Sequence, residues 1–216
     1  LFYFQWQLDF RTRKYPRENF LNPQVADYGK ALIEFAQGMA ITCPEDATWL
    51  AIHGANQFGV DKVSLVDREM WALNNTKNAL DVYEDPFACL WWQDADKPWA
   101  ALAWCFEWAE YTIAVGEGRE FITHLPCQAD GSCNGIQHLS AMLLDEEGGR
   151  SVNLLPSDKP EDIYGDVAAK ATVTLQIEAE AGNEVAKQLL EVGICRTIAK
   201  RPVMIVPYSG TKHACR

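Results

Sequence analysis

The sequence lacks the features of several specialised classes of protein. None of its apolar runs reaches the roughly 18 residues that a membrane-spanning helix needs, so we expect no membrane partner. Its seven cysteines are an odd number without a Cys-x-x-Cys pair, which argues against a disulfide framework and indicates a reducing compartment. The four histidines show no zinc spacing, and we expect each to be a core or polar-network residue.

The amino-terminal segment lacks an initiator methionine and the hallmarks of a signal peptide. Residues 1–7 read Leu-Phe-Tyr-Phe-Gln-Trp-Gln, with no basic start and no small-residue cleavage site. This composition is typical of a strand entered midway, so we expect the 216 residues to be a piece of a longer polypeptide. With 48% hydrophobic and 23% charged residues, the chain has the composition of a globular protein of one or two domains.

Positive charge is scarce overall but concentrated at the two ends. The formal net charge is −11, which by itself argues against a nucleic-acid partner. Nine of the nineteen basic residues nevertheless lie in residues 1–17 and 194–216, where Asp9 is the only carboxylate. Because a bound anion responds to the local field, both segments are candidates for binding phosphate groups.

The periodicity of apolar residues predicts a mixed α/β fold dominated by helices. Strands are expected at 1–10 and 121–125. Helices are expected at 27–37, from 44 past 53, from 64 to about 80, from 98, at 133–144, 160–181 and 183–192, and around 196–200. Ser64 and Asp67 resemble a capping box. Most of the eight tryptophans lie in 71–108, which indicates a packed aromatic core there.

Asp130 is the first candidate site residue. It lies where the predicted strand gives way to a Gly-Ser-Cys-Asn-Gly turn and a helix, and a carboxylate at the end of a buried strand is well placed to ligate a divalent ion. Gly131 lets its backbone carbonyl approach the same ion, and hard oxygen ligands of this kind suit Mg²⁺. Asp-Gly-Ser is also an ordinary turn sequence, and that alternative stays open.

Arg196, Lys200 and Tyr208 form a second candidate group. Arg196 and Lys200 are four residues apart on one helical face, and the segment offers them no acidic partner, so an anion between them would relieve their repulsion. Tyr208 lies about 18 Å farther along an ideal helix, which is comparable to an extended nucleoside triphosphate. Pro202 and Pro207 predict that the helix bends or begins close to Pro202. The alternative is a solvated basic face with a core tyrosine.

Several stretches match the motifs of one protein family. Residues 130–138 (Asp-Gly-Ser-Cys-Asn-Gly-Ile-Gln-His) and the spacing Arg196-x3-Lys200-x7-Tyr208 resemble its palm motif and its fingers helix. Further matches are Gly148-Gly149-Arg150 through Ser157, Asp162-Ile163-Tyr164-Gly165, residues 52–56, residues 59–63 and Asp9-Phe10-Arg11-Thr12-Arg13. The family is that of the single-subunit, bacteriophage-type DNA-directed RNA polymerases, and the resemblance covers essentially the whole chain in order.

The resemblance implies DNA-templated transfer of a nucleotidyl group from an NTP to an RNA 3′-end, with release of pyrophosphate. Asp130 would be one of two catalytic aspartates that bind two Mg²⁺ ions, with the Gly131 carbonyl as an additional ligand. The triphosphate would be held by Arg196, by the catalytic residue Lys200, and by Arg201, with Lys62 as a further contact. Tyr208 would sit beside the nucleotide sugar. The RNA–DNA hybrid would lie along Arg11, Arg13 and Tyr15.

The resemblance also implies a partial right-hand polymerase fold. It divides the chain into a first palm segment at 1–38, a helical palm insertion at 39–120, a palm strand–turn–helix at 121–146 and part of the fingers at 147–216. The implied partners are a DNA template, an RNA product and NTPs. The implied enzyme is a monomer in the cytoplasm of a phage-infected bacterial host.

The chain departs from the family pattern at three points. Thr12 and Ser209 each stand where the family usually has glycine. The second catalytic aspartate belongs to a His-Asp motif, and no His-Asp dipeptide occurs in this sequence. One carboxylate cannot position two metal ions, so we expect little or no activity from the isolated chain.

Two alternative functions stay open. The chain could be a non-catalytic nucleotide- or nucleic-acid-binding module derived from a polymerase core, or part of a family A DNA polymerase. In those DNA polymerases the fifth residue after the metal-binding aspartate is a glutamate that blocks a ribose 2′-hydroxyl. Gly135 occupies that position here and leaves room for a ribonucleotide, which favours RNA synthesis.

Overall fold

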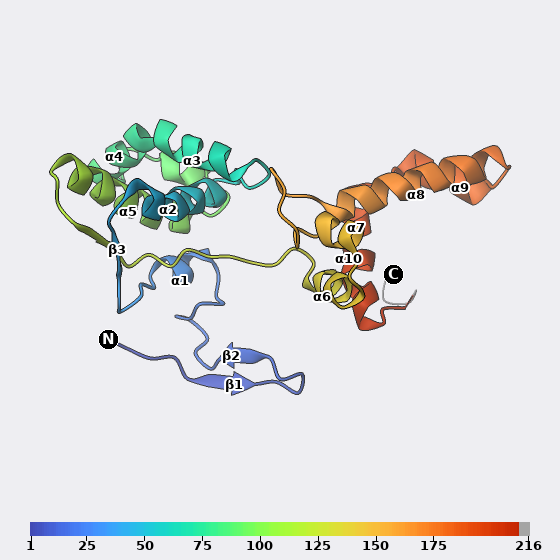
Figure 1. Cartoon of the computed structure of the whole chain (residues 1–216), viewed down its shortest axis with the longest axis horizontal. Helices are drawn as coiled ribbons and strands as arrows, with labels where there is room; N and C mark the ends of the chain where they lie inside the picture. Colours follow the sequence, from blue (N-terminus) through green and yellow to red (C-terminus); the bar gives the residue numbers. More distant parts are fainter. Residues whose placement is uncertain (212–216) are drawn as a thin grey trace. The chain divides into compact units, whose positions relative to one another are not determined.

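The computed structural model describes residues 1–211, which fold into two compact units (Figure 1). The first unit is Leu1–Ala129 and the second is Asp130–Arg216. Lys212 and Arg216, counted above among the basic residues, lie outside the described residues, as do His213 and Cys215. The fold is mixed α/β and dominated by helices, as predicted. Within residues 1–211 no helix is both long and apolar enough to cross a membrane.

The first unit combines two small antiparallel sheets with a group of packed helices. Its strands are β1 (Trp6–Leu8), β2 (Lys14–Pro16), β3 (Met39–Ile41) and β4 (Phe121–Thr123). Its helices are α1 (Asp27–Ala31), α2 (Pro44–Gln57), α3 (Leu65–Asn74), α4 (Thr76–Glu84), the 3₁₀ turn η1 (Trp91–Asp94) and α5 (Pro98–Gly116). β1 pairs with β2, and β3 pairs with β4.

The core of the first unit is built around tryptophans of α5, as the sequence predicted. Trp104 is fully buried, and its indole N–H donates to the Leu50 carbonyl of α2 over 2.9 Å. A Cβ on Gly54 would lie only 2.0 Å from the Trp104 ring, so only glycine lets α2 and α5 approach this closely. Trp108 donates its indole N–H to Thr76 on α4 over 3.0 Å. These contacts join α2, α4 and α5 around one apolar centre.

The pairing of β3 with β4 overturns the helix expected at 27–37. α1 ends at Ala31, and the chain then extends into β3, where Ala40 pairs with Ile122. The Phe35 N–H donates to the His124 carbonyl over 2.9 Å, so the extended segment begins before the strand itself. A long-range backbone ladder has therefore overridden a local apolar spacing that is compatible with a helix.

Other differences from the predicted elements are local. The Ser64 hydroxyl accepts the Asp67 N–H over 3.1 Å and starts α3 as expected, but the predicted helix breaks at Asn75 and resumes as α4. The helix expected at 133–144 ends at Leu143, close to its predicted end. A further short helix that the sequence did not predict spans Glu146–Ser151, and the Asp145 side chain caps it by accepting the Gly148 N–H over 3.1 Å.

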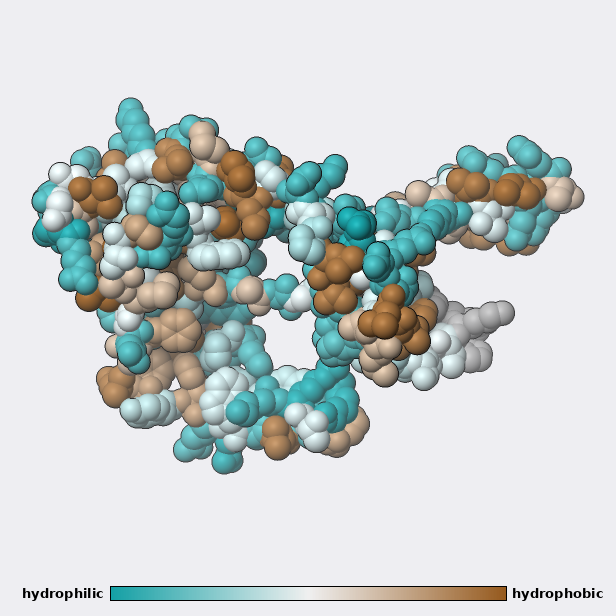
Figure 2. Space-filling model, viewed as in Figure 1, coloured by the Kyte–Doolittle hydropathy of each residue, from teal (hydrophilic) through white to brown (hydrophobic). Residues whose placement is uncertain are grey.

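The second unit has helices and no strands among its described residues. It contains α6 (Asn134–Leu143), α7 (Glu146–Ser151), α8 (Ile163–Glu180), α9 (Glu184–Val192), α10 (Arg196–Ile205) and the 3₁₀ turn η2 (Val206–Tyr208). α8 packs against both α9 and α10. Apolar side chains of α8 and α9 remain exposed among hydrophilic ones (Figure 2), namely Val173, Ile177, Val185, Leu189 and Val192.

The β1–β2 turn contains a strained residue. Thr12 has φ 62°, in the left-handed region where a Cβ-bearing residue costs about 1–2 kcal/mol. The Asp9 carboxylate holds the turn closed by accepting the Arg11 N–H over 2.8 Å and the Arg13 N–H over 3.0 Å. The structure therefore gives a physical reason for the glycine that the family usually has at this position.

Replacing Thr12 by glycine is expected to stabilise the turn by about 1 kcal/mol, because glycine adopts positive φ without a steric penalty. Amide hydrogen exchange would then slow by about fivefold for the Asp9 and Arg17 N–H groups, which bond across the hairpin. Thr12→Ala is the control, since it keeps the Cβ and should leave exchange nearly unchanged. Equal exchange rates in the glycine and alanine variants would contradict the strain.

His53 is a buried histidine on α2, as the sequence predicted. It is 4% exposed, and both ring nitrogens lie within 3.4 Å of the Gln57 side-chain amide. The Gln128 N–H also approaches Nδ1 at 3.4 Å. Burial, together with the positive charge of Lys97, lowers the pKa of His53 from 6.5 to about 4. The ring is therefore neutral in the folded protein at neutral pH.

This lowered pKa predicts a loss of stability in acid. Between pH 6.5 and about 4 the unfolded chain binds a proton that the folded chain does not, so the free energy of unfolding should fall by about 3 kcal/mol over that interval. Urea denaturation followed by circular dichroism at pH 7.5, 5.5 and 4.5 measures the slope. His53→Gln cannot titrate and should show a shallower slope. Identical slopes would contradict a buried neutral imidazole.

Candidate functional site

Asp130 opens the second unit on an exposed, irregular stretch of backbone. β4 ends at Thr123, so the expectation that Asp130 directly follows a strand is wrong. The strand stops because its partner β3 begins at Met39, which already pairs with Thr123. The turn predicted after Asp130 is present and leads into α6 through Cys133, which has φ 56°.

The oxygen atoms at Asp130 are suited to a metal ion but incomplete as a site. The Gly131 N–H donates to Asp130 Oδ1 over 2.8 Å, while Oδ2 has no hydrogen-bond partner among the described residues. A Cβ on Gly131 would lie 3.3 Å from the Gln137 side-chain oxygen, so the backbone here is closely covered on that side. Residues 1–211 contain no cluster of three or more His, Cys, Asp or Glu side chains that could hold a metal. Within residues 1–211, the Asp130 turn thus offers one carboxylate and the Gly131 carbonyl to a hard cation.

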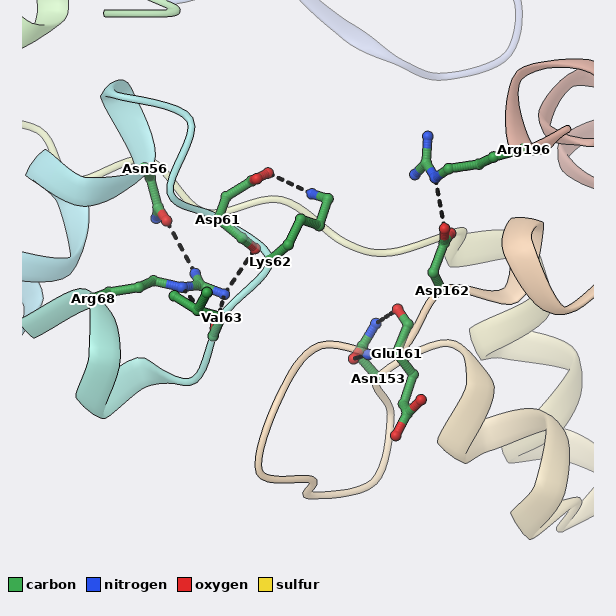
Figure 3. A network of polar contacts seen from close by, with 9 residues as sticks. All are labelled: Asn56, Asp61, Lys62, Val63, Arg68, Asn153, Glu161, Asp162 and Arg196. Carbon is green, nitrogen blue, oxygen red and sulfur yellow. Dashed lines mark hydrogen bonds and ion pairs between the residues drawn. The ribbon is translucent and has the colours of Figure 1, made fainter. Parts of the chain in front are cut away.

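Arg196 has an acidic partner, contrary to the sequence-based expectation. It is the first residue of α10, and its Nε donates to Asp162 Oδ2 over 2.7 Å (Figure 3). Its guanidinium also lies over the Tyr164 ring, 5.2 Å from the centroid. Asp162 is far from Arg196 in sequence, and the packing of α8 against α10 brings the two together. The local sequence around Arg196 could not reveal this pair.

Lys200 and Arg201 are exposed on α10. Neither side chain makes an ion pair or hydrogen bond within residues 1–211. α10 starts at Arg196, so a helix start close to Pro202 is wrong, and Pro202 lies inside the helix. A single proline removes one backbone hydrogen bond from this helix, which the remaining bonds tolerate.

Tyr208 lies in η2 rather than on a continuous α-helix with Arg196. It is 59% exposed, which excludes the alternative of a core tyrosine. Its hydroxyl donates to Asn134 Oδ1 over 3.1 Å. The next residue, Ser209, has φ 59°, so this second departure from a family glycine also falls on left-handed backbone.

Gly135 joins the Asp130 turn to the Tyr208 turn. A Cβ at this buried position would lie 2.8 Å from Pro207 Cβ and 3.2 Å from Tyr208 Cζ. Distances this short require a shift of Pro207, so any larger side chain would push η2 away from α6. The absence of a side chain at Gly135 therefore has a packing cause within the chain.

Tyr164 connects Arg196 to the same turn. Burial and a hydrogen bond with the Cys133 side chain raise the pKa of the Tyr164 phenol to about 12. The phenol is therefore protonated at neutral pH, and its ring face supports the Arg196 guanidinium. Asp162, Tyr164 and Asn134 were not among the candidates from the sequence, although all three lie in stretches that resemble the family, residues 162–165 and 130–138.

The remaining candidates belong to the first unit. Lys62 is paired with Asp61 through its ammonium group. Its loop is fixed by the buried Arg68, whose guanidinium donates to the Asn56 side chain and to the carbonyls of Asp61 and Val63 (Figure 3).

Arg11, Arg13 and Tyr15 lie on the β1–β2 hairpin. Arg11 forms an ion pair with Asp9, in which its terminal nitrogen lies 2.9 Å from Oδ2. Arg13 is exposed, and its guanidinium has no partner among the described residues. Tyr15 pairs with Gln7 across the hairpin and is half-buried. Arg13 is therefore the hairpin arginine most available to an external phosphate.

Comparisons with known proteins identify the family. A family model described as DNA-dependent RNA polymerase matches residues 42–216. The chain is 39% identical to T7 RNA polymerase of Escherichia phage T7 over 99% of its length, and spans 26% of that protein. It is 39% identical to the mitochondrial DNA-directed RNA polymerase of Schizosaccharomyces pombe and 38% identical to that of Homo sapiens, and spans 18% of each. The chain therefore belongs to the family of single-subunit, T7-like DNA-dependent RNA polymerases.

Proposed function

We propose that this chain is part of the catalytic core of an enzyme that synthesises RNA on a DNA template. The observation that carries the proposal is the junction at Gly135, which holds the Asp130 turn against the segment bearing Arg196, Lys200 and Tyr208. A metal-ligating carboxylate, phosphate-binding cations and a sugar-facing phenol are the groups that nucleotidyl transfer requires. The relatives' names support this assignment, since they are DNA-directed RNA polymerases.

Asp130 and the Gly131 carbonyl would bind Mg²⁺ through hard oxygen ligands, and the free Oδ2 of Asp130 is available for this. Bound metal would activate the RNA 3′-hydroxyl and neutralise charge on the phosphates. The chain's own site is incomplete within the described residues, so a second carboxylate has to come from elsewhere in the complete enzyme. A non-catalytic binding module is the rival that this incompleteness favours.

Arg196, Lys200 and Arg201 would bind the triphosphate, and Lys200 would deliver a proton to the departing pyrophosphate. The exposed, unpaired side chains of Lys200 and Arg201 support this role, because a solvated cation without a carboxylate partner is available to an anion. Lys62 would add a contact after leaving Asp61. Arg11, Arg13 and Tyr15 would line the RNA–DNA hybrid.

The finer architecture is part of the same proposal. We assign residues 1–38 and 121–146 to the palm, 39–120 to a helical palm insertion and 147–216 to the fingers. The enzyme would act as a monomer on DNA, RNA and NTPs. Residues 148–157 and 200–204 favour the cytoplasm of a phage-infected bacterium, although mitochondrial relatives are equally similar.

Asp130→Asn, built into a complete polymerase that carries this chain, is expected to abolish RNA synthesis at every Mg²⁺ concentration, because an amide does not replace an anionic ligand. Primer extension with increasing Mg²⁺ tests this. Asp158→Asn, at an exposed position of the same unit, is the control and should retain activity. Asp130→Asn activity within about tenfold of the parent would exclude the metal role and favour the binding module.

Tyr208→Phe is expected to lose about 1 kcal/mol of discrimination against deoxynucleotides, roughly five- to tenfold, if the hydroxyl makes one hydrogen bond toward the 2′-oxygen. Competition between an NTP and its deoxy analogue measures the ratio. Asn134→Ala keeps the hydroxyl but removes its partner within the chain. An equal loss in both variants would assign the effect to that internal bond, and unchanged discrimination by Tyr208→Phe would remove the residue from the role.

A further inference from the structure

Asp162 occupies a helix-capping position without capping its helix. It is the N-cap residue of α8, and an aspartate there ordinarily accepts a backbone N–H from the first turn. Its side chain makes no such bond, and Oδ2 instead accepts the Arg196 Nε–H over 2.7 Å. The carboxylate thus lies beside the first turn of α8, where a Cβ on Gly165 would be 3.2 Å from Oδ2, but its hydrogen bond goes to the start of α10.

The backbone next to Asp162 is itself anchored. The Asn153 side chain donates to the Glu161 carbonyl over 2.9 Å and accepts the Glu161 N–H over 2.7 Å (Figure 3). This reciprocal pair closes the loop that leads into α8. The backbone that carries Asp162 is therefore held in place where its side chain bonds Arg196.

Arg196 is held on two sides and open on a third. Asp162 binds Nε, and the Tyr164 ring lies against the guanidinium at 5.2 Å. The two terminal nitrogens point away from the carboxylate (Figure 3), and neither has a partner within residues 1–211. An arginine with both terminal nitrogens available can bind a phosphate in a bidentate manner.

Stability does not explain the pair. The side chains of Arg196 and Asp162 are 45% and 37% exposed, and ion pairs as exposed as this contribute little to folding. Holding a long side chain in one orientation does, however, reduce the entropy that it would lose on binding a ligand. The arrangement of the pair therefore fits binding better than folding.

We propose that Asp162 is a positioning residue that orients the Arg196 guanidinium toward the triphosphate of the incoming nucleotide. This inference rests on the proposed function of Arg196. The carboxylate takes Nε, leaves the terminal nitrogens to the phosphate oxygens, and does not itself contact the nucleotide.

The test is nucleotide kinetics in a complete polymerase that carries this chain. Asp162→Ala should raise the KM for NTP by about tenfold, the loss expected for one charge-assisted hydrogen bond, and leave kcat and affinity for the RNA–DNA hybrid nearly unchanged. Asp162→Asn retains an acceptor oxygen for Nε and should stay within about threefold of the parent KM. In an Arg196→Ala background, Asp162→Ala should add nothing.

Two further variants separate positioning from a structural role. Asp162→Ser can cap α8 but is too short to reach Nε, so it should raise KM as alanine does even if alanine destabilises the helix. Asn183→Ala removes the side chain that caps α9, where Oδ1 accepts the Val185 and Ala186 N–H groups. It should lower the thermal stability without changing KM.

The outcomes are distinct. A higher KM for Arg196→Ala with an unchanged KM for Asp162→Ala and Asp162→Ser overturns the positioning role alone. A lower KM for the Asp162 variants also overturns it, since the carboxylate would then compete with the triphosphate. An unchanged KM for Arg196→Ala overturns both this inference and the proposed role of Arg196.

Discussion

The close contact between α6 and η2 at Gly135 is the constraint on which the candidate site of the second unit depends. With only a hydrogen atom at this position, Pro207 reaches the helix that follows the Asp130 turn, and the Tyr208 hydroxyl reaches Asn134. Candidate site residues from segments about seventy residues apart are thereby held by packing rather than by ionic attraction.

Helices with strong local start signals were predictable from the sequence, while features that depend on distant partners were not. Prolines at 44 and 98 and the Asn183 cap place the starts of α2, α5 and α9 correctly, because each signal acts within one helical turn. The β3–β4 ladder and the Asp162–Arg196 pair join residues far apart in the chain. No local spacing encodes either of them, and both changed an expectation.

The residues of the candidate site also divide into those that local motifs indicate and those that depend on distant contacts. Motif spacing selected Asp130, Arg196 and Tyr208 as candidates because their residue types suit metal, phosphate and sugar binding. It did not select Asn134 or Asp162, because their contacts with Tyr208 and Arg196 come from residues far away in the sequence. Thr12 and Ser209, which replace glycines usual in the family, were predictable in part. The sequence shows that the residue is unusual at each position, but only the backbone angles show that both have left-handed φ values.

The tryptophan-rich core has a consequence for optical experiments. All eight indoles lie at or before Trp108, within the first unit, whereas the aromatic phenols of the second unit are Tyr164 and Tyr208. Intrinsic fluorescence excited at the long-wavelength edge of tryptophan absorption therefore reports on the first unit alone. A single tryptophan introduced into the second unit would add a signal from that unit, which has no tryptophan of its own.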